Sequence, residues 1–442
     1  MNKKRDSFSG RVGFVLACIG SAVGMGNIWR FPNLVSTYGG LTFLIPYVLF
    51  VILIAKTGMV EEFAFGRAAR TGPVGAFGWA TEQRGNRKIG ERIGLIPVLG
   101  SLALAIGYTV VMGWIIKYTY LAFSGGLTAM GQDMDVIGGT FGVTADTFGA
   151  NLWIVIAIVI SFAIMSFGIA GGIEKANKFM MPILFLLFLL LGIYIAFLPG
   201  ATDGYKYILT IQPGGLKDPK VWIYAFGQAF FSLSVAGNGS VIYGSYLGND
   251  EDIPKSAISV ACFDTLAAVL AAFVIIPAMA TTGEQLSAGG PGLMFIYLVN
   301  VFNGMAASRF IGIVFFTCVL FAGTSSIINL YEAPVEFIQE RFGAKRPIAV
   351  ASILAVGCVS ALFIQHITSQ WMDVVSIYIC PLGALLAGIM FFWVVKKDKA
   401  IEAVNTGSQV HIGNSFYFLG KYVYIILALV ALVAGALLGG IG

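Results

Sequence analysis

Apolar segments long enough to cross a membrane recur along almost the whole chain. A helix of roughly 20 apolar residues spans the hydrocarbon core of a bilayer. Because a helix satisfies its backbone hydrogen bonds within one segment, repeated segments of this kind predict an all-α polytopic membrane protein. Hydropathy places about eleven spans near residues 11–36, 41–68, 91–124, 151–169, 175–198, 221–247, 255–281, 308–341, 347–365, 371–396 and 416–438.

The composition excludes several other classes of protein. Charged residues make up 11% of the chain, whereas soluble domains contain about 25%. The five cysteines lie in apolar segments without CxxC spacing and there are only two histidines, so neither disulfides nor a histidine metal site is expected. No catalytic motif or phosphate-binding loop is present, so the chain is not expected to be an enzyme.

The connecting segments differ in charge, and this difference predicts the topology. Lys and Arg concentrate in the connections at 69–90, 249–254, 342–346 and 397–415, whereas 125–150 contains three Asp and no basic residue. By the positive-inside rule the N-terminus is cytoplasmic. We therefore expect a multi-pass protein of the inner (plasma) membrane whose net charge of +5 reflects its cytoplasmic loops, with the lipid bilayer and no nucleic acid as a partner. No cleaved signal peptide is expected.

Two of the spans are interrupted by glycine and polar residues. The sequence CIGSAVGMGNIWRFPN (18–33) lies in the first span and FFSLSVAGNGSVIYGSY (230–246) in the sixth. Interrupted helices at corresponding positions of two five-span halves indicate a midplane binding site in a transporter. Close helix packing would account for Gly20 and Gly24, but not for the polar side chains of Asn27, Ser232 and Ser234 at the same depth.

Further polar residues lie at the depth of the bilayer. Thr324 and Ser325 are adjacent in the eighth span, where their hydroxyls either complete an oxygen site for sodium or bond to their own helix. Asp264 in the seventh span is an intramembrane carboxylate and thus a functional candidate. Lys56 in the second span is expected to pair with Glu61 or Glu62.

Four motifs in order along the chain resemble the neurotransmitter:sodium symporters, especially their bacterial amino-acid transporters with eleven spans. They are RVGFVLACIGSAVGMGNIWRFP (11–32), EFAFGR (62–67), GQAFFSLS (227–234) and AGTSS (322–326), and the match covers about residues 5–396. The resemblance implies a fold of five plus five spans in inverted repeat, with the first and sixth spans unwound. The expected parts are a cytoplasmic segment 1–10, repeats 11–198 and 221–396, and a loop with an additional eleventh span at 397–442.

The resemblance also implies a sodium-driven symporter that imports an amino acid by alternating access and binds two Na⁺ ions. One sodium site would use Gly20, Val23, Phe321, Thr324 and Ser325. The other would use Ala22, Asn27, Ser232, Asp264 and the carboxylate of the substrate. Because this carboxylate is shared, the substrate and the ion would each raise the affinity of the protein for the other.

The same resemblance implies the substrate site and the gates. The substrate site would comprise Ala22, Gly24, Met25, Gly26, Leu104, Tyr108, Phe231, Ser232, Ser234, Gly237, Ser325 and Asn329. Arg30 and Asp373 would form an outer gate, and Arg5 and Glu340 an inner one.

Departures from the relatives predict the substrate and the ion dependence. Gly237 replaces a bulky phenylalanine of leucine-selective relatives and Asn329 replaces an aliphatic residue, which favours an aromatic, tyrosine-like or bulky hydrophobic amino acid. Asp264 replaces the Asn of chloride-dependent relatives, so transport is expected to be independent of chloride. The alternatives are a sodium symporter of a different small neutral amino acid and a substrate sensor that does not transport. The oligomeric state is left open.

Overall fold

The computed structural model describes residues 6–235, 239–282 and 291–441. Within these ranges the regular structure is helical, apart from an isolated bridge between Gly40 and Ile211. Short 3₁₀ or π-helical turns are labelled η. The first half contains α1 Arg11–Ala22, η1 Gly26–Arg30, α2 Phe31–Tyr38, α3 Leu41–Ile54, η2 Ala55–Met59, α4 Val60–Ala69, α5 Pro73–Glu82, α6 Arg87–Ser124, α7 Gly126–Ala129, α8 Met134–Ala145, α9 Asn151–Met165, η3 Ile169–Ile173, α10 Glu174–Ala196 and α11 Ala201–Ile208.

The second half contains the remaining helices of the described chain. They are η4 Gly215–Lys217, α12 Pro219–Ser232, α13 Gly239–Ser245, α14 Ile253–Thr282, η6 Leu293–Tyr297, α15 Leu298–Asn303, α16 Ser308–Phe342, α17 Arg346–Phe363, η7 Gln365–Ile367, α18 Thr368–Val374, η8 Val375–Ile379, α19 Cys380–Ile389, η9 Met390–Val394, α20 Lys397–Asn405, α21 Asn414–Phe418, η10 Leu419–Tyr424 and α22 Ile425–Leu438. The prediction of an all-α polytopic protein is confirmed.

Eight helical segments of the described chain are long and apolar enough to cross a membrane, and the bent pair formed by α1 and residues 26–38 makes a ninth. The prediction of about eleven spans also included 151–169 and 221–247. In the structure, α9 has 15 residues, and the sixth segment consists of α12 with 14 residues and α13 with 7. These helices are too short to cross a bilayer as single straight rods, since a helix rises only about 1.5 Å per residue.

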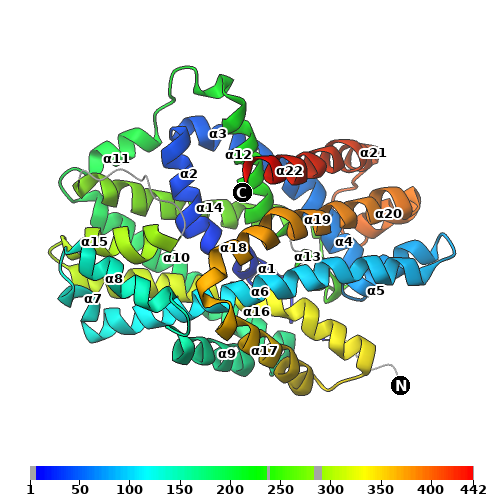
Figure 1. The fold of residues 1–442 in the computed structure, drawn as a ribbon. Helices are drawn as coiled ribbons and strands as arrows, with labels where there is room; N and C mark the ends of the chain where they lie inside the picture. The colour runs from blue at the N-terminus through cyan, green and yellow to red at the C-terminus, as the bar shows by residue number, and fades with distance from the viewer. Residues whose placement is uncertain (1–5, 236–238, 283–290, 442) are drawn as a thin grey trace.

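The outer surface of the bundle is apolar, as contact with lipid requires. Large hydrophobic side chains are exposed along α9, α10 and α22, for example Val159, Leu189 and Leu429. Figure 1 shows α5 and α20, which adjoin basic connections, at one end of the molecule and α7, α8 and α11 at the other. The basic and acidic connections are thus separated across the bundle.

One expected contact is absent. The side chain of Lys56 is exposed on η2, whereas Glu61 and Glu62 are fully buried, so the predicted ion pair does not form. The reason is helical rotation: Lys56 shares the outward stripe of the exposed residues Leu49 and Ile52, and the two glutamates point inward. Lysine carries a long apolar stem that tolerates such a position.

Helices α1, α10 and α16 converge at the centre and position the candidate site. Helix α1 packs against α10 and α16, and α10 also packs against α16. Helix α6 packs along α16, and Figure 1 shows α1 in the middle of the bundle. The interrupted ends of α1 and α12 are therefore buried among helices rather than exposed to lipid, as irregular backbone in a membrane requires.

Candidate functional site

The first break lies between α1 and η1. Helix α1 ends at Ala22, Val23 is extended (φ −72°, ψ 99°), and the chain bends by 57° before it continues as a helix. The Asn27 side chain accepts a hydrogen bond from the Gly24 amide at 3.3 Å and so supports the unwound turn. Leaving the helix here frees backbone carbonyls that a cation or a substrate ammonium group can use.

The second break follows α12, which ends at Ser232. Ser234 has φ 56°, in the left-handed region that residues with a Cβ atom rarely occupy. Its hydroxyl donates to the carbonyl of Ser21 at 2.9 Å, which joins the two breaks directly. Helix α13 resumes at Gly239, and Gly237 lies outside the described residues.

A buried polar cluster connects both breaks to α14. Asn27 Nδ2 donates to Asp264 Oδ1 at 2.8 Å and to Ser232 Oγ at 3.3 Å, and Ser232 Oγ donates to Asp264 Oδ2 at 2.6 Å. All three side chains are at most 2% exposed. The structure thus brings together three residues predicted for one sodium site. Ser232 and Asp264 supply hydroxyl and carboxylate oxygens, which are hard donors suited to such a cation, whereas Asn27 faces them with its Nδ2.

Two cavities lie on either side of Tyr108 and Phe231. The inner cavity, of about 50 Å³, is lined by residues of both breaks, α6, α16 and α19. The predicted substrate residues that line it are Ala22, Gly24, Gly26, Leu104, Tyr108, Phe231, Ser232, Ser234 and Asn329. The outer cavity, of about 440 Å³, is lined by Met25, among others, and shares Gly26, Tyr108 and Phe231 with the inner one.

Asn329 lines the inner cavity and has a buried oxygen without a hydrogen-bond partner among the described residues. The side chain is 3% exposed, Nδ2 donates to the Ser21 hydroxyl, and Oδ1 has no hydrogen-bond partner in the described structure. A buried acceptor of this kind costs free energy unless a donor reaches it. The wall of the cavity therefore contains an acceptor that is suited to a hydroxyl or N–H donor.

The residues predicted for the other sodium site lie where α1 meets α16. A Cβ atom placed on Gly20 would lie 3.0 Å from Ser325 Cβ, and Ser326 Oγ approaches the Val23 carbonyl at 3.5 Å. The Ser325 hydroxyl donates to the Ala322 carbonyl at 2.9 Å, within its own helix. Thr324 is buried, and the ring of Phe321 lies 5.9 Å from that of Phe179.

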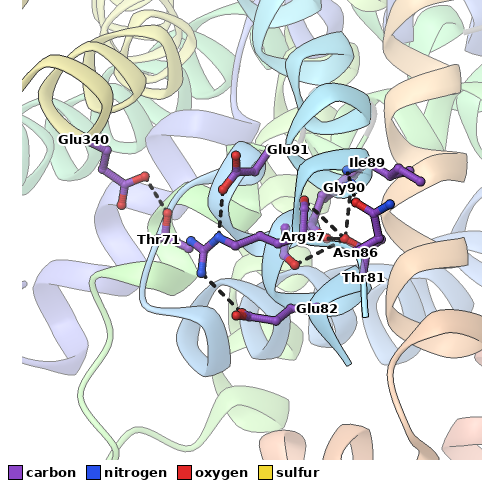
Figure 2. Close-up of polar contacts among 11 residues, drawn as sticks. Thr71, Thr81, Glu82, Asn86, Arg87, Ile89, Gly90, Glu91 and Glu340 are labelled. Carbon is purple, nitrogen blue, oxygen red and sulfur yellow. Dashed lines mark hydrogen bonds and ion pairs between the residues drawn. The ribbon is translucent and has the colours of Figure 1, made fainter. Parts of the chain in front are cut away.

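The predicted gate residues are placed at the two ends of the site. Arg30 and Asp373 both line the outer cavity, and among the ion pairs of the described residues there is none between these two. At the other end, Glu340 accepts a hydrogen bond from Thr71 at 2.5 Å, beside Arg87, which is paired with Glu91 and Glu82 (Figure 2). Arg5, the expected partner of Glu340, lies outside the described residues.

Several lining residues were not predicted from the sequence. Ser21, Ser101, Ser326 and Cys380 line the inner cavity, and Ser326 Oγ would lie 2.8 Å from a Cβ atom on Gly24. Ser326 directly follows the predicted Thr324 and Ser325, so the run of three hydroxyl residues was a usable signal. Which of them faces the cavity depends on the rotation of α16, because neighbouring helical residues point about 100° apart.

Two interrupted spans whose breaks meet at a buried polar cluster beside a cavity define a secondary transporter. The chain belongs to the sodium:neurotransmitter symporter family, whose model matches residues 5–132 and 141–438. It is therefore a sodium-dependent symporter of the membrane and not an enzyme.

Two relatives and one solved structure match almost the whole chain. An uncharacterized sodium-dependent transporter of Methanocaldococcus jannaschii is 32% identical over 95% of this chain and 88% of its own length. The uncharacterized sodium-dependent transporter YhdH of Bacillus subtilis is 30% identical over 95% of this chain and 94% of its own. The crystal structure of MhsT in complex with L-phenylalanine is similar with a TM-score of 0.85, at 29% identity, and covers 97% of this chain and 99% of that one.

Proposed function

We propose that the protein imports an aromatic amino acid, with tyrosine as the preferred substrate, together with sodium. The observation that supports this substrate most directly is the unpartnered Oδ1 of Asn329, a residue that lines the inner cavity. A phenolic hydroxyl would donate to it. MhsT, a structural neighbour of this chain, was crystallised with L-phenylalanine, which is in keeping with an aromatic side chain at this position.

The charged ends of the amino acid would lie at the two breaks. The carboxylate is proposed to meet the Tyr108 hydroxyl and the amides of Met25 and Gly26, and the ammonium group the carbonyls of Ala22, Phe231 and Ser232. At about 50 Å³ the inner cavity is too small for an aromatic amino acid. Binding therefore requires its walls to move apart, and Phe231, which lies between the two cavities, is the side chain best placed to do so.

Two sodium ions are proposed to drive the import. Asn27, Ser232, Asp264 and the Ala22 carbonyl would hold one, together with the substrate carboxylate. Gly20, Val23, Phe321, Thr324 and Ser325 would hold the other. Sharing the carboxylate couples the first ion to the substrate, because each supplies a favourable contact that the other needs.

The fixed charge of Asp264 is proposed to make transport independent of chloride. The carboxylate contacts Asn27 and Ser232 directly and supplies a negative charge within the buried cluster. We further propose that the protein lies in the inner (plasma) membrane with its N-terminus in the cytoplasm, so that the outer cavity faces the external medium.

Competition binding tests the substrate. Purified protein in NaCl would be incubated with labelled tyrosine and increasing amounts of tyrosine, phenylalanine or leucine. We expect tyrosine to compete best and leucine worst. The variant Asn329→Leu should bind tyrosine about tenfold less tightly relative to phenylalanine, since one hydrogen bond is lost. Better competition by leucine than by tyrosine in the wild-type protein would contradict the proposal.

A further inference from the structure

Asn177 has a buried oxygen without a partner outside the substrate cavity. It lies in the first turn of α10 and its side chain is 0% exposed. Nδ2 donates to the Ile173 carbonyl at 2.9 Å, whereas Oδ1 has no hydrogen-bond partner among the described residues. Since a carbonyl oxygen can only accept, the atom bonded to Ile173 is the amide nitrogen, and this bond fixes which way the oxygen points.

This oxygen points at the backbone of the broken first span. A Cβ atom placed on Gly20 would lie 1.9 Å from Asn177 Oδ1 and 3.0 Å from Ser325 Cβ. The oxygen therefore occupies the space that a larger residue at position 20 would need, beside the α16 serine. The three helices that meet here, α1, α10 and α16, pack against one another in pairs.

A purely structural role does not account for this oxygen. The hydrogen bond to Ile173 belongs to the turn that joins η3 to α10, and it uses only the nitrogen. An oxygen buried among helices without a donor is unfavourable. A hard cation is a natural partner for an oxygen of this kind, and Gly20 and Ser325, two residues assigned to a sodium site, lie beside it.

We propose that Asn177 Oδ1 is a further ligand of the sodium ion held by Gly20, Val23, Thr324 and Ser325. The proposal rests on the assignment of that sodium site under the proposed function. It gives the ion a neutral oxygen from α10 in addition to those from α1 and α16. Sodium would then connect all three helices, and its release would remove one link between α10 and α1.

Sodium titration of three variants tests this ligand. Asn177→Leu removes the oxygen and keeps a similar volume, and Asn177→Asp keeps an oxygen and adds a charge. Asn300→Leu removes a buried asparagine in α15, away from the site, and serves as the matched control. Binding of ²²Na⁺ and the sodium-induced rise in Tm would be measured without substrate, with K⁺ keeping the ionic strength constant.

We expect Asn177→Leu to bind sodium about 10- to 100-fold more weakly, the range seen when supporting groups of metal sites are removed. Asn177→Asp should bind sodium more tightly than the wild type, and Asn300→Leu should match it. Wild-type sodium affinity in Asn177→Leu would overturn the inference. If that variant does not fold, unchanged affinity in Asn177→Asp would overturn it equally. A wild-type protein without any sodium response would instead overturn the proposed function, and the inference with it.

Discussion

At the residue scale, Gly24 leaves the space in which the substrate carboxylate is proposed to lie. A Cβ atom at this position would be 2.8 Å from Ser326 Oγ and 3.8 Å from the Tyr108 hydroxyl. Gly24→Ala should therefore weaken tyrosine binding by about tenfold or more, since steric overlap of this kind costs roughly 1–3 kcal/mol. Equilibrium binding of labelled tyrosine measures the effect. Gly138→Ala, with open space around the added methyl group, is the control, and equal binding by both variants would contradict this placement.

The negative charge of Asp264 is the feature on which the proposed chloride independence rests. Asp264→Asn removes the negative charge but keeps the size of the side chain in the cluster with Asn27 and Ser232. The variant should lose transport in gluconate medium and regain it when chloride is supplied, because an anion then replaces the missing charge. Sodium-dependent uptake in chloride and in gluconate, for wild type and variant, measures this. Loss of wild-type uptake in gluconate would refute chloride independence.

Some of these residues could be predicted from the sequence, and others could not, for a physical reason. Asn27, Ser232 and Asp264 are polar residues at membrane depth, where burial is costly unless the side chain binds an ion, a substrate or another polar group. The structure brings all three together. Ser21 and Ser326 were missed because a hydroxyl can always bond to its own helix. Their contact with the cavity depends on how α1 and α16 are rotated against each other. Asn177 was missed because it lies in an apolar span whose neighbours are known only from the fold.

At the scale of elements, the crossing of α4 and α13 depends on two glycines. A Cβ atom on Gly66 would lie 1.9 Å from the Val241 carbonyl oxygen, and one on Gly244 would lie 2.4 Å from that of Phe63. Backbone this close leaves no room for a side chain. Gly66→Ala should destabilise the protein by about 1–3 kcal/mol, measured as a lower Tm in detergent. In the control Gly139→Ala, in α8, the added Cβ atom has no neighbour within 4 Å, so Tm should not change. An unchanged Tm for Gly66→Ala would show that the helices can separate freely.

The breaks themselves could be predicted from the sequence, but their geometry could not. Glycine and polar residues inside an apolar span indicate where a helix must end, and α1 and α12 end within those stretches. The 57° bend and the left-handed Ser234 result from how the two breaks contact each other. Such contacts join residues more than 200 positions apart, and no local pattern encodes them.

At the scale of the whole molecule, the two broken spans and α14 form one polar unit within an apolar bundle. Asn27, Ser232 and Asp264 join the two halves of the chain, so movement of one half changes the surroundings of the other. The repeat boundaries 11–198 and 221–396 stay predictions. Symport requires that sodium and the substrate bind to this unit together and cross the membrane together.

Uptake into proteoliposomes tests that requirement most directly. Purified protein would be reconstituted and labelled tyrosine added outside, with an inward sodium gradient or with K⁺ in place of Na⁺. We expect tyrosine to accumulate above its external concentration only with the sodium gradient, and the accumulated label to be released when a sodium ionophore collapses the gradient. Saturable tyrosine binding without accumulation, or equal uptake in K⁺, would contradict sodium-driven import.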